Sequence, residues 1–449
     1  MLLAKSKPRC CIPLQLGHSP NVAPGVLSSG LRSLLAFDMA SSTPSRQRWT
    51  VLSGLFLVYM ASNGITLHTL PLLYPELMET FGWREGEVTL PATVFFIVGA
   101  LTSPPAGWLL DRYSARGIIA IGSALLALAL VAYSATATLW QLVAIYALLG
   151  LALSLCGLVS NMVMLTGWFQ TGRGRATGIL LMASSLGGAL FPLAVGTGIE
   201  HLGWRHTVLA TGLCVGCVML GSAWLLLRDV PNSAAVDATD DAPVAPLQEL
   251  LSIVMARRFV AIVFATGSLW FIIIALTQHQ SIYLARDVGL DRSLLPLIFS
   301  LFFGASVIGK LGFGWLADRF DLHRVMAVAT IMLAGALGLL SQASPDAMGL
   351  LYTYAILAGL GFSGAFTCIQ ILVAAHYSGP HYGKILATIV LIDTLCGALG
   401  TRVVAMAREW QESYVPALTG LALLAGLSAL LVLSLSRTEP VETAKAEPA

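Results

Sequence analysis

Three charged side chains lie inside long apolar runs of the sequence. They are Lys310, Asp393 and Arg402, and every other Lys, Arg, Asp or Glu falls in a polar stretch or at the end of an apolar one. Burying a charge in apolar surroundings is costly, so such residues are functional candidates by default. An ammonium group there can bind an anion, and a carboxylate can bind and release a proton. The three residue types therefore indicate anion binding, with protonation as a coupled step.

The composition of the chain says what surrounds these charges. Of 449 residues, 57% are hydrophobic and only 11% are charged, whereas soluble domains carry roughly 25% charged residues. Many apolar segments reach the length of 18 or more residues that a bilayer requires. The net charge of +2 gives no reason to expect a nucleic-acid partner. We predict an integral membrane protein whose apolar segments are surrounded by the lipid bilayer.

The apolar segments predict an all-α membrane protein of twelve transmembrane helices in two six-helix bundles. The polar stretch 229–256 is rich in Pro, Asp and Ala and divides the helices six and six. We therefore predict a disordered cytoplasmic tail over 1–48, a bundle over 49–228, a linker over 229–256, a bundle over 257–436 and a tail over 437–449. The expected helices are 49–73, 87–109, 117–136, 139–168, 175–199, 205–228, 257–284, 293–316, 324–343, 347–377, 383–407 and 413–436.

Basic residues predict the orientation. If both termini are cytoplasmic, Lys and Arg in the cytoplasmic loops outnumber those in the outer loops, as membrane proteins prefer. Residues 1–48 hold six basic residues among Pro, Ser and Gly, and Met39 is an alternative start of the chain. We expect both tails and the linker on the cytoplasmic side.

A repeated motif relates the two halves. GWLLDRYSARG begins at Gly107 and GWLADRFDLHR begins at Gly314, and Phe95-Phe96 precedes the first copy by the same distance as Phe302-Phe303 precedes the second. A repeat of this length predicts two structurally related halves joined by pseudo-two-fold symmetry. It also gives each residue of one half a counterpart in the other.

The paired motif and the six-plus-six pattern resemble the major facilitator superfamily. FGWREGE at 81–87, WFQTGRGRATGI at 168–179 and a histidine near the end of span seven resemble its monocarboxylate-porter and oxalate/formate-exchanger branch. The resemblance implies a secondary transporter of small organic anions, working by alternating access and by proton coupling or exchange. It also implies a bacterial inner membrane as the location and a monomer as the working unit.

The Asp-Arg turns are candidate gates. Asp111 lies at the C-terminal end of span two, where the helix dipole disfavours a carboxylate without a partner. Arg112, Arg116 and Arg175 are candidate partners, and Asp318 with Arg319 repeats the arrangement in the second half. The resemblance implies a gate that holds the cytoplasmic ends together, and the alternative is a set of topology anchors without a gating role.

Aligning the halves shows that the fold does not require the intramembrane charges. Ser103 is the counterpart of Lys310, and Ser184 is the counterpart of Asp393. By the rise of 1.5 Å per residue, Lys310 and Asp393 lie within a few ångströms of the same depth. Since the resembling family lines its central cavity with spans eight and eleven, we predict that Lys310 contacts Asp393. Arg402 faces elsewhere.

The working hypothesis makes Lys310 the anion site and Asp393 its proton-linked counter-charge. Protonation of Asp393 would release Lys310 for a carboxylate. The alternative is a structural ion pair between spans eight and eleven. Because span eleven carries an acid at mid-depth where the resembling branch carries a base, a monocarboxylate is favoured over a dianion.

Polar side chains on other spans are secondary candidates for substrate binding. An Asn or Gln in a membrane helix is equally well explained by helix–helix contact. His68 is expected near the membrane interface. The secondary candidates are Tyr59, Asn63, Asn161, Gln278, His279 and Arg402.

Enzymatic function is not expected. GASVIGKL at 304–311 lacks the Ser or Thr of a phosphate-binding loop, and the glycines of GLGFSG at 359–364 are expected to permit close helix packing. No metal or cofactor site is indicated. Two alternatives to an organic-anion carrier stay open: an exporter of amphipathic drugs or metabolites, and a transporter-shaped sensor that binds without moving solute.

Overall fold

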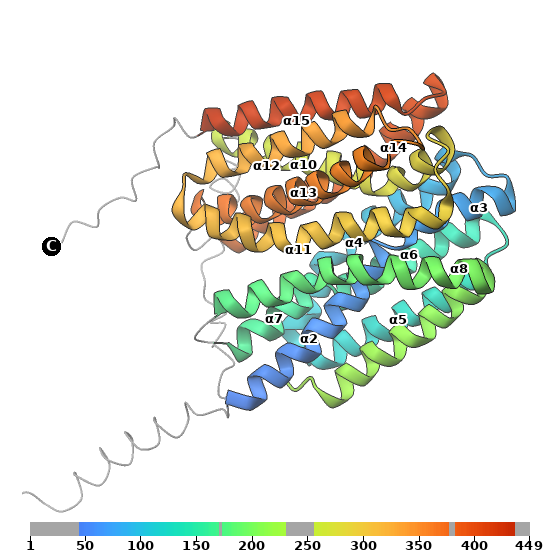
Figure 1. Ribbon diagram of the computed structural model, residues 1–449. Helices are drawn as coiled ribbons and strands as arrows, with labels where there is room; N and C mark the ends of the chain where they lie inside the picture. Colours follow the sequence, from blue (N-terminus) through green and yellow to red (C-terminus); the bar gives the residue numbers. More distant parts are fainter. Residues whose placement is uncertain (1–44, 170–172, 230–255, 377–381, 436–449) are drawn as a thin grey trace, which may run out of the picture. The chain divides into compact units, whose positions relative to one another are not determined.

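The computed structural model describes residues 45–169, 173–229, 256–376 and 382–435, and within these ranges it is built of helices without strands (Figure 1). The chain divides into two compact units, Met1–Arg48 and Trp49–Ala449. Most of the predicted N-terminal tail and linker, and the C-terminal tail, lie outside the described residues. Their boundaries stay predictions.

The helices of the first half follow the expected spans with two interruptions. The first span ends early because Pro71 and Pro75 turn the chain after α2, and the fourth is broken at Gly157, whose backbone is extended (φ −85°, ψ −150°). The elements are α2 Ser45–Thr66, η1 Leu70–Leu73, α3 Tyr74–Phe81, α4 Glu85–Arg112, α5 Ala115–Ser134, α6 Leu139–Cys156, α7 Leu158–Trp168 and α8 Arg173–Leu225.

Helix α8 makes two crossings. Its 53 residues would extend about 80 Å at 1.5 Å per residue, whereas a bilayer core is about 30 Å thick. Gly203 lies in the middle with φ 75° and ψ 160°, a conformation open to glycine, and the chain reverses there. Eleven described stretches are long and apolar enough to cross a membrane, and counting α8 twice gives the twelve expected spans.

The second half repeats the first more regularly. Its elements are α10 Arg257–Ile282, the π-helical turn η3 Tyr283–Asp287, η4 Arg292–Leu294, α11 Leu295–Arg319, α12 Leu322–Leu340, α13 Met348–His376, α14 Tyr382–Gln411 and α15 Val415–Leu435. We call the end of the molecule where α8 stops and α10 starts the linker end, and the opposite end, which holds α3, η3 and η4, the far end.

The predicted repeat is confirmed in backbone detail at the two Asp-Arg turns. Tyr113 ends α4 with φ −122° and ψ 164°, and Phe320 ends α11 with φ −123° and ψ 166°. The next helix is capped in both copies, by the side chain of Ser114 on the Gly117 amide and by that of Asp321 on the Arg324 amide. The same local sequence thus makes the same turn twice.

Glycines set the helix crossings in both halves. A Cβ on Gly150 of α6 would lie 2.5 Å from the carbonyl oxygen of Phe95 in α4, and one on Gly359 of α13 would collide with the carbonyl oxygen of Phe302 in α11. These are equivalent crossings, and the second confirms that the GLGFSG glycines permit close packing.

Gly359→Ala is expected to destabilise the protein by about 1–3 kcal/mol, because the added methyl group meets backbone that cannot move aside easily. The melting temperature in detergent measures this. Gly338→Ala is the matched control, since its Cβ would meet no atom within 4 Å. Equal melting temperatures for the two variants would show that the α11–α13 crossing is loosely packed.

Candidate functional site

Lys310 lies in the middle of α11, where the two halves meet. Its Nζ donates a hydrogen bond of 2.9 Å to the carbonyl oxygen of Leu181 in α8, and it lies 5.2 Å from the ring centre of Phe366 in α13. Within the described residues no carboxylate forms an ion pair with it. The ammonium group therefore has no carboxylate counter-ion in the part of the chain that the structure describes.

The Lys310 contact belongs to a regular line of contacts between α8 and α11, which run side by side in Figure 1. We call this line the α8–α11 seam. Each step toward the far end pairs a residue of one half with a residue of the other. The pairs are Leu181 with Lys310, Ser185 with Ser306 (Oγ–Oγ 2.8 Å), Gly188 with Phe303, and Gly196 with Pro296.

Asp393 is buried on a different helix pair. Its side chain is 2% exposed, and its Oδ1 accepts a hydrogen bond of 2.8 Å from the Thr266 hydroxyl of α10. The expected contact with Lys310 is absent from this structure. The reason is packing: α14 lies against α10 and α4, whereas α11 lies against α13 and α8.

The first-half candidates are buried, and their hydrogen bonds are local. Tyr59 is 4% exposed, and the Asn63 amide donates to the Ser62 hydroxyl over 3.3 Å. Asn161 donates to the carbonyl oxygens of Cys156 and Gly157, at 2.7 and 2.6 Å. These are the carbonyls at the break between α6 and α7, so Asn161 stabilises that break.

Gln278 and His279, near the C-terminal end of α10, both form hydrogen bonds to other segments. Gln278 accepts a hydrogen bond of 2.7 Å from the Tyr74 hydroxyl of the other half. Both ring nitrogens of His279 are engaged within their own half, Nδ1 with the Tyr414 hydroxyl at 3.0 Å and Nε2 with the Thr401 carbonyl oxygen at 2.8 Å. Gln278 thus joins the halves, whereas His279 fixes the packing of α10, α14 and α15.

The turn residues expected to gate the linker end make local contacts. Arg112 and Arg319 each lie 4.3 Å from a tryptophan ring one turn earlier, Trp108 and Trp315. Arg116 donates to the carbonyl oxygens of Ala223 and Trp224, both at 2.9 Å, and so caps the end of α8. Arg175 and Asp318 are exposed, and the Asp111 side chain lies outside the described residues. Gating by these residues stays a prediction.

Ion pairs between the halves occur at the far end. We call this set the far-end cluster. Carboxylates of the first half face guanidinium groups of the second, and Arg402 adds a bond of 3.3 Å to the Gly86 carbonyl oxygen. The pairs are Glu85 with Arg286 (3.6 Å) and Arg408 (3.9 Å), and Arg292 with Glu76 (3.0 Å) and Glu79.

Replacing Glu85 by Gln is expected to loosen the far end. It weakens contacts to two guanidinium groups, each worth a few tenths to 1 kcal/mol at a partly exposed site. The test uses a cysteine-free background with Ser281→Cys, because Ser281 is buried and donates to the Pro71 carbonyl oxygen across the halves. When Glu85→Gln is added, this cysteine should react severalfold faster with a water-soluble thiol reagent than it does with Glu85 in place. Glu87→Gln is the control, since Glu87 binds its own helix at the Arg84 amide. An unchanged labelling rate would show that the cluster does not hold the end closed.

His68 is the residue that sequence reasoning placed wrongly. It is 7% exposed rather than interfacial, its Nε2 lies 3.0 Å from the Ser184 hydroxyl, and its ring lies 4.0 Å from that of Phe303 in the other half. Its position just before the Pro71 turn was the available signal, since the chain bends there instead of continuing to the membrane surface.

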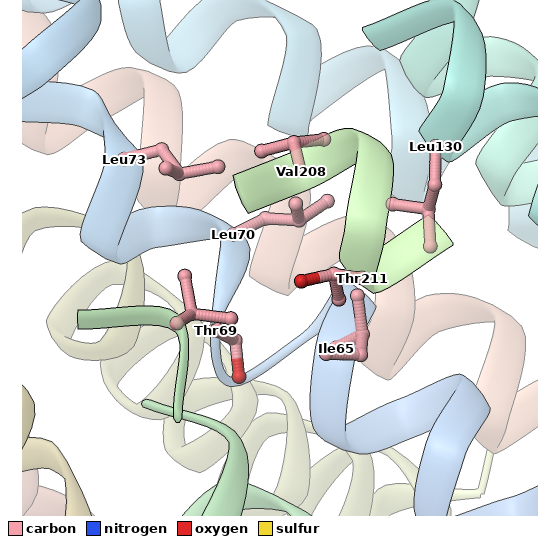
Figure 2. A pocket seen from close by; sticks show the side chains of 8 residues that line it. Ile65, Thr69, Leu70, Leu73, Leu130, Val208 and Thr211 are labelled. Atoms are coloured by element: carbon pink, nitrogen blue, oxygen red, sulfur yellow. The ribbon is translucent and has the colours of Figure 1, made fainter. Parts of the chain in front are cut away.

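Cavities in the described part of the chain are small in this conformation. One of about 10 Å³ lies among apolar side chains that include Leu70, Leu130 and Val208 (Figure 2), too small for a solute. Another, of about 240 Å³, opens beside Arg292 and Glu76 of the far-end cluster. Neither of these two cavities is lined by Lys310.

Comparisons with known proteins agree with this architecture. The sensor protein UhpC of Salmonella typhimurium is 24% identical over 60% of this chain, a match that spans 66% of the sensor, just under two thirds. A gallate transporter of Pseudomonas putida is 28% identical over 74% of this chain and 79% of its own. A bacterial homologue of the lysosomal transporter Spinster, solved in an inward-facing and occupied conformation, has the same fold, with a TM-score of 0.68, 17% identity and coverage of 89% and 98%.

The family follows from the sequence model that the chain matches. The model of the Major Facilitator Superfamily covers residues 51–401 and 280–449, which is most of the chain. The relatives indicate a transporter rather than an enzyme. With its twelve apolar crossings and repeated Asp-Arg turns, this chain is a member of the major facilitator superfamily.

Proposed function

We propose that the protein is a secondary transporter that carries a small organic anion with one carboxylate. The observation that carries the proposal is the placement of Lys310: a cationic side chain at the mid-membrane seam between the halves, without an acidic partner among the described residues. A partly buried cation of this kind attracts an anion, because the low dielectric of the surrounding protein strengthens the interaction. The similarity to a gallate transporter supports the same class of substrate.

Aromatic side chains around Lys310 favour an anion with an apolar or aromatic body. Phe366 lies under its ammonium group, with Trp270 6.0 Å and Phe362 6.4 Å away between ring centres. An aromatic pair contributes about 0.5–1.5 kcal/mol beyond the burial of its apolar area, so these side chains would stabilise a bound aromatic ring. We therefore rank aromatic monocarboxylates first and short aliphatic ones, which the monocarboxylate-porter resemblance favours, second.

We assign proton coupling to Asp393, which would act through helix α10 rather than through a direct contact with Lys310. Asp393 is held by Thr266 of α10, and α10 also carries Gln278 and Ser281, which bind the first half. A change in protonation of Asp393 would alter the α10–α14 contact and, through α10, the contact between the halves. This indirect coupling takes the place of the sequence-based hypothesis, in which protonation of Asp393 directly released Lys310 for the substrate.

Transport would follow alternating access. Opening one end requires the far-end cluster to separate, and opening the other requires the halves to part at the linker end. Basic residues are more numerous at the linker end, which supports a cytoplasmic orientation of that end. With that orientation, the ion pairs of the far-end cluster would close the outer side of the transporter in this conformation.

Uptake into proteoliposomes tests the proposal. Labelled gallate, benzoate and lactate are supplied with and without an imposed pH gradient, and empty liposomes give the background. Uptake of at least one acid that a gradient accelerates is the expected result. Background uptake of every acid, together with active extrusion of amphipathic cations, would replace the proposal with the exporter.

The similarity to a sensor protein favours a second candidate, a receptor that binds an organic anion without moving it. Binding and transport separate the two. Saturable binding of an acid in detergent with no uptake or exchange in proteoliposomes would identify a sensor. Uptake of many substrate molecules per protein molecule would identify a carrier.

A further inference from the structure

His68 has an unusual hydrogen-bonding state. It is more than nine-tenths buried, and its Nε2 is paired with the Ser184 hydroxyl at 3.0 Å, but its buried Nδ1 has no hydrogen-bond partner among the described residues. Buried polar atoms in proteins almost always have a partner, since an unpaired one costs about 1–3 kcal/mol. A neutral imidazole can offer Nδ1 as a donor or as an acceptor, depending on its tautomer.

His68 and Lys310 approach the same face of α8. Ser184, which holds His68, lies three residues beyond Leu181, which holds Lys310. Residues three apart on a helix are neighbours on its surface, separated by about 5 Å along the axis. The two residues of α8 that the polar heads contact therefore lie about one helical turn apart, and the heads come from different halves of the protein.

A row of rings connects the two polar heads. It runs from Phe366 beneath Lys310 to Phe362, then to Phe303, and ends at the ring of His68, with successive ring centres 6.4, 6.1 and 4.0 Å apart. The rings are not coplanar, since the planes of Phe303 and Phe362 meet at 89°, so they offer an aromatic lining between the two heads rather than one flat surface.

We propose that His68 is a specificity-determining residue that hydrogen-bonds a hydroxyl group on the substrate, at the end opposite the carboxylate held by Lys310. This inference rests on the proposed function and narrows its substrate class to hydroxylated aromatic carboxylates. A hydroxyl both donates and accepts, so either tautomer of His68 can bind it. A second carboxylate would lack a second cationic partner at this end of the row.

Two acids that differ by one hydroxyl test the assignment. The protein with its natural sequence is expected to prefer 4-hydroxybenzoate over benzoate in competition for uptake. His68→Phe keeps a ring against Phe303 but has no polar atom, so the preference should fall by roughly threefold to tenfold, the value of one neutral hydrogen bond. His68→Gln, which keeps a donor and an acceptor, should retain part of it.

The control is His201→Phe, an exposed histidine of α8 remote from the row, which should leave the preference unchanged. Full preference for 4-hydroxybenzoate in both His68→Phe and His68→Gln would overturn the inference, as would equal transport of the two acids by the unmodified protein. Failure of the unmodified protein to move any acid would instead refute the proposed function, so the two failures are distinguishable.

Discussion

Lys310→Ser is expected to lower carboxylate uptake by roughly tenfold to a hundredfold. A hydrogen bond to a charged group contributes about 1.5–3 kcal/mol, which corresponds to a factor of this size. The variant should still fold, because the repeat places Ser103 at the equivalent position of the first half and the bond lost is one to the Leu181 carbonyl oxygen. Initial uptake rates of a labelled aromatic acid, normalised to folded protein, measure the effect.

A charge-preserving variant separates charge from packing at this position. Lys310→Arg should retain more uptake than Lys310→Ser, although the larger guanidinium group has to fit against Phe366. Ser306→Ala, one turn away on the same seam, is the neutral control and removes a hydroxyl bonded to Ser185. Normal uptake in Lys310→Ser would show that the anion binds elsewhere.

Asp393→Asn is expected to abolish acceleration of uptake by a pH gradient while leaving exchange of substrate across the membrane. The amide oxygen can still accept the Thr266 hydroxyl, and the side chain keeps its volume, so the α10–α14 contact survives. An amide cannot bind and release a proton at ordinary pH. Uptake with and without an inward proton gradient, compared with counterflow at equal pH, measures the difference.

Asp346→Asn is the matched control, since Asp346 is an exposed acid in the loop between α12 and α13. It should leave gradient-driven uptake intact. If Asp393→Asn accumulates substrate as the unmodified protein does, Asp393 is structural, and the proton is carried by another group.

Local and periodic features were readable from the sequence. The apolar segments predicted the crossings because a bilayer demands a fixed helix length. The two Asp-Arg turns predicted the repeat because chemically similar residues end and cap helices in the same way. The correspondence extends to Tyr113 and Phe320, whose backbone angles agree within a few degrees. Lys310 and Asp393 were found in the same way, since charges in apolar runs are visible without a structure.

Which side chains meet was decided by the tertiary structure. Equal depth in the membrane did not bring Lys310 to Asp393, because depth follows from residue count whereas direction depends on how each helix is rotated and which neighbour it packs against. His68 was misplaced for a related reason: a proline turn bends the chain inward, and an apolar run does not report the bend. The far-end cluster joins Glu85 to Arg408, which are hundreds of residues apart, and such pairings exist only once both halves are folded and in contact.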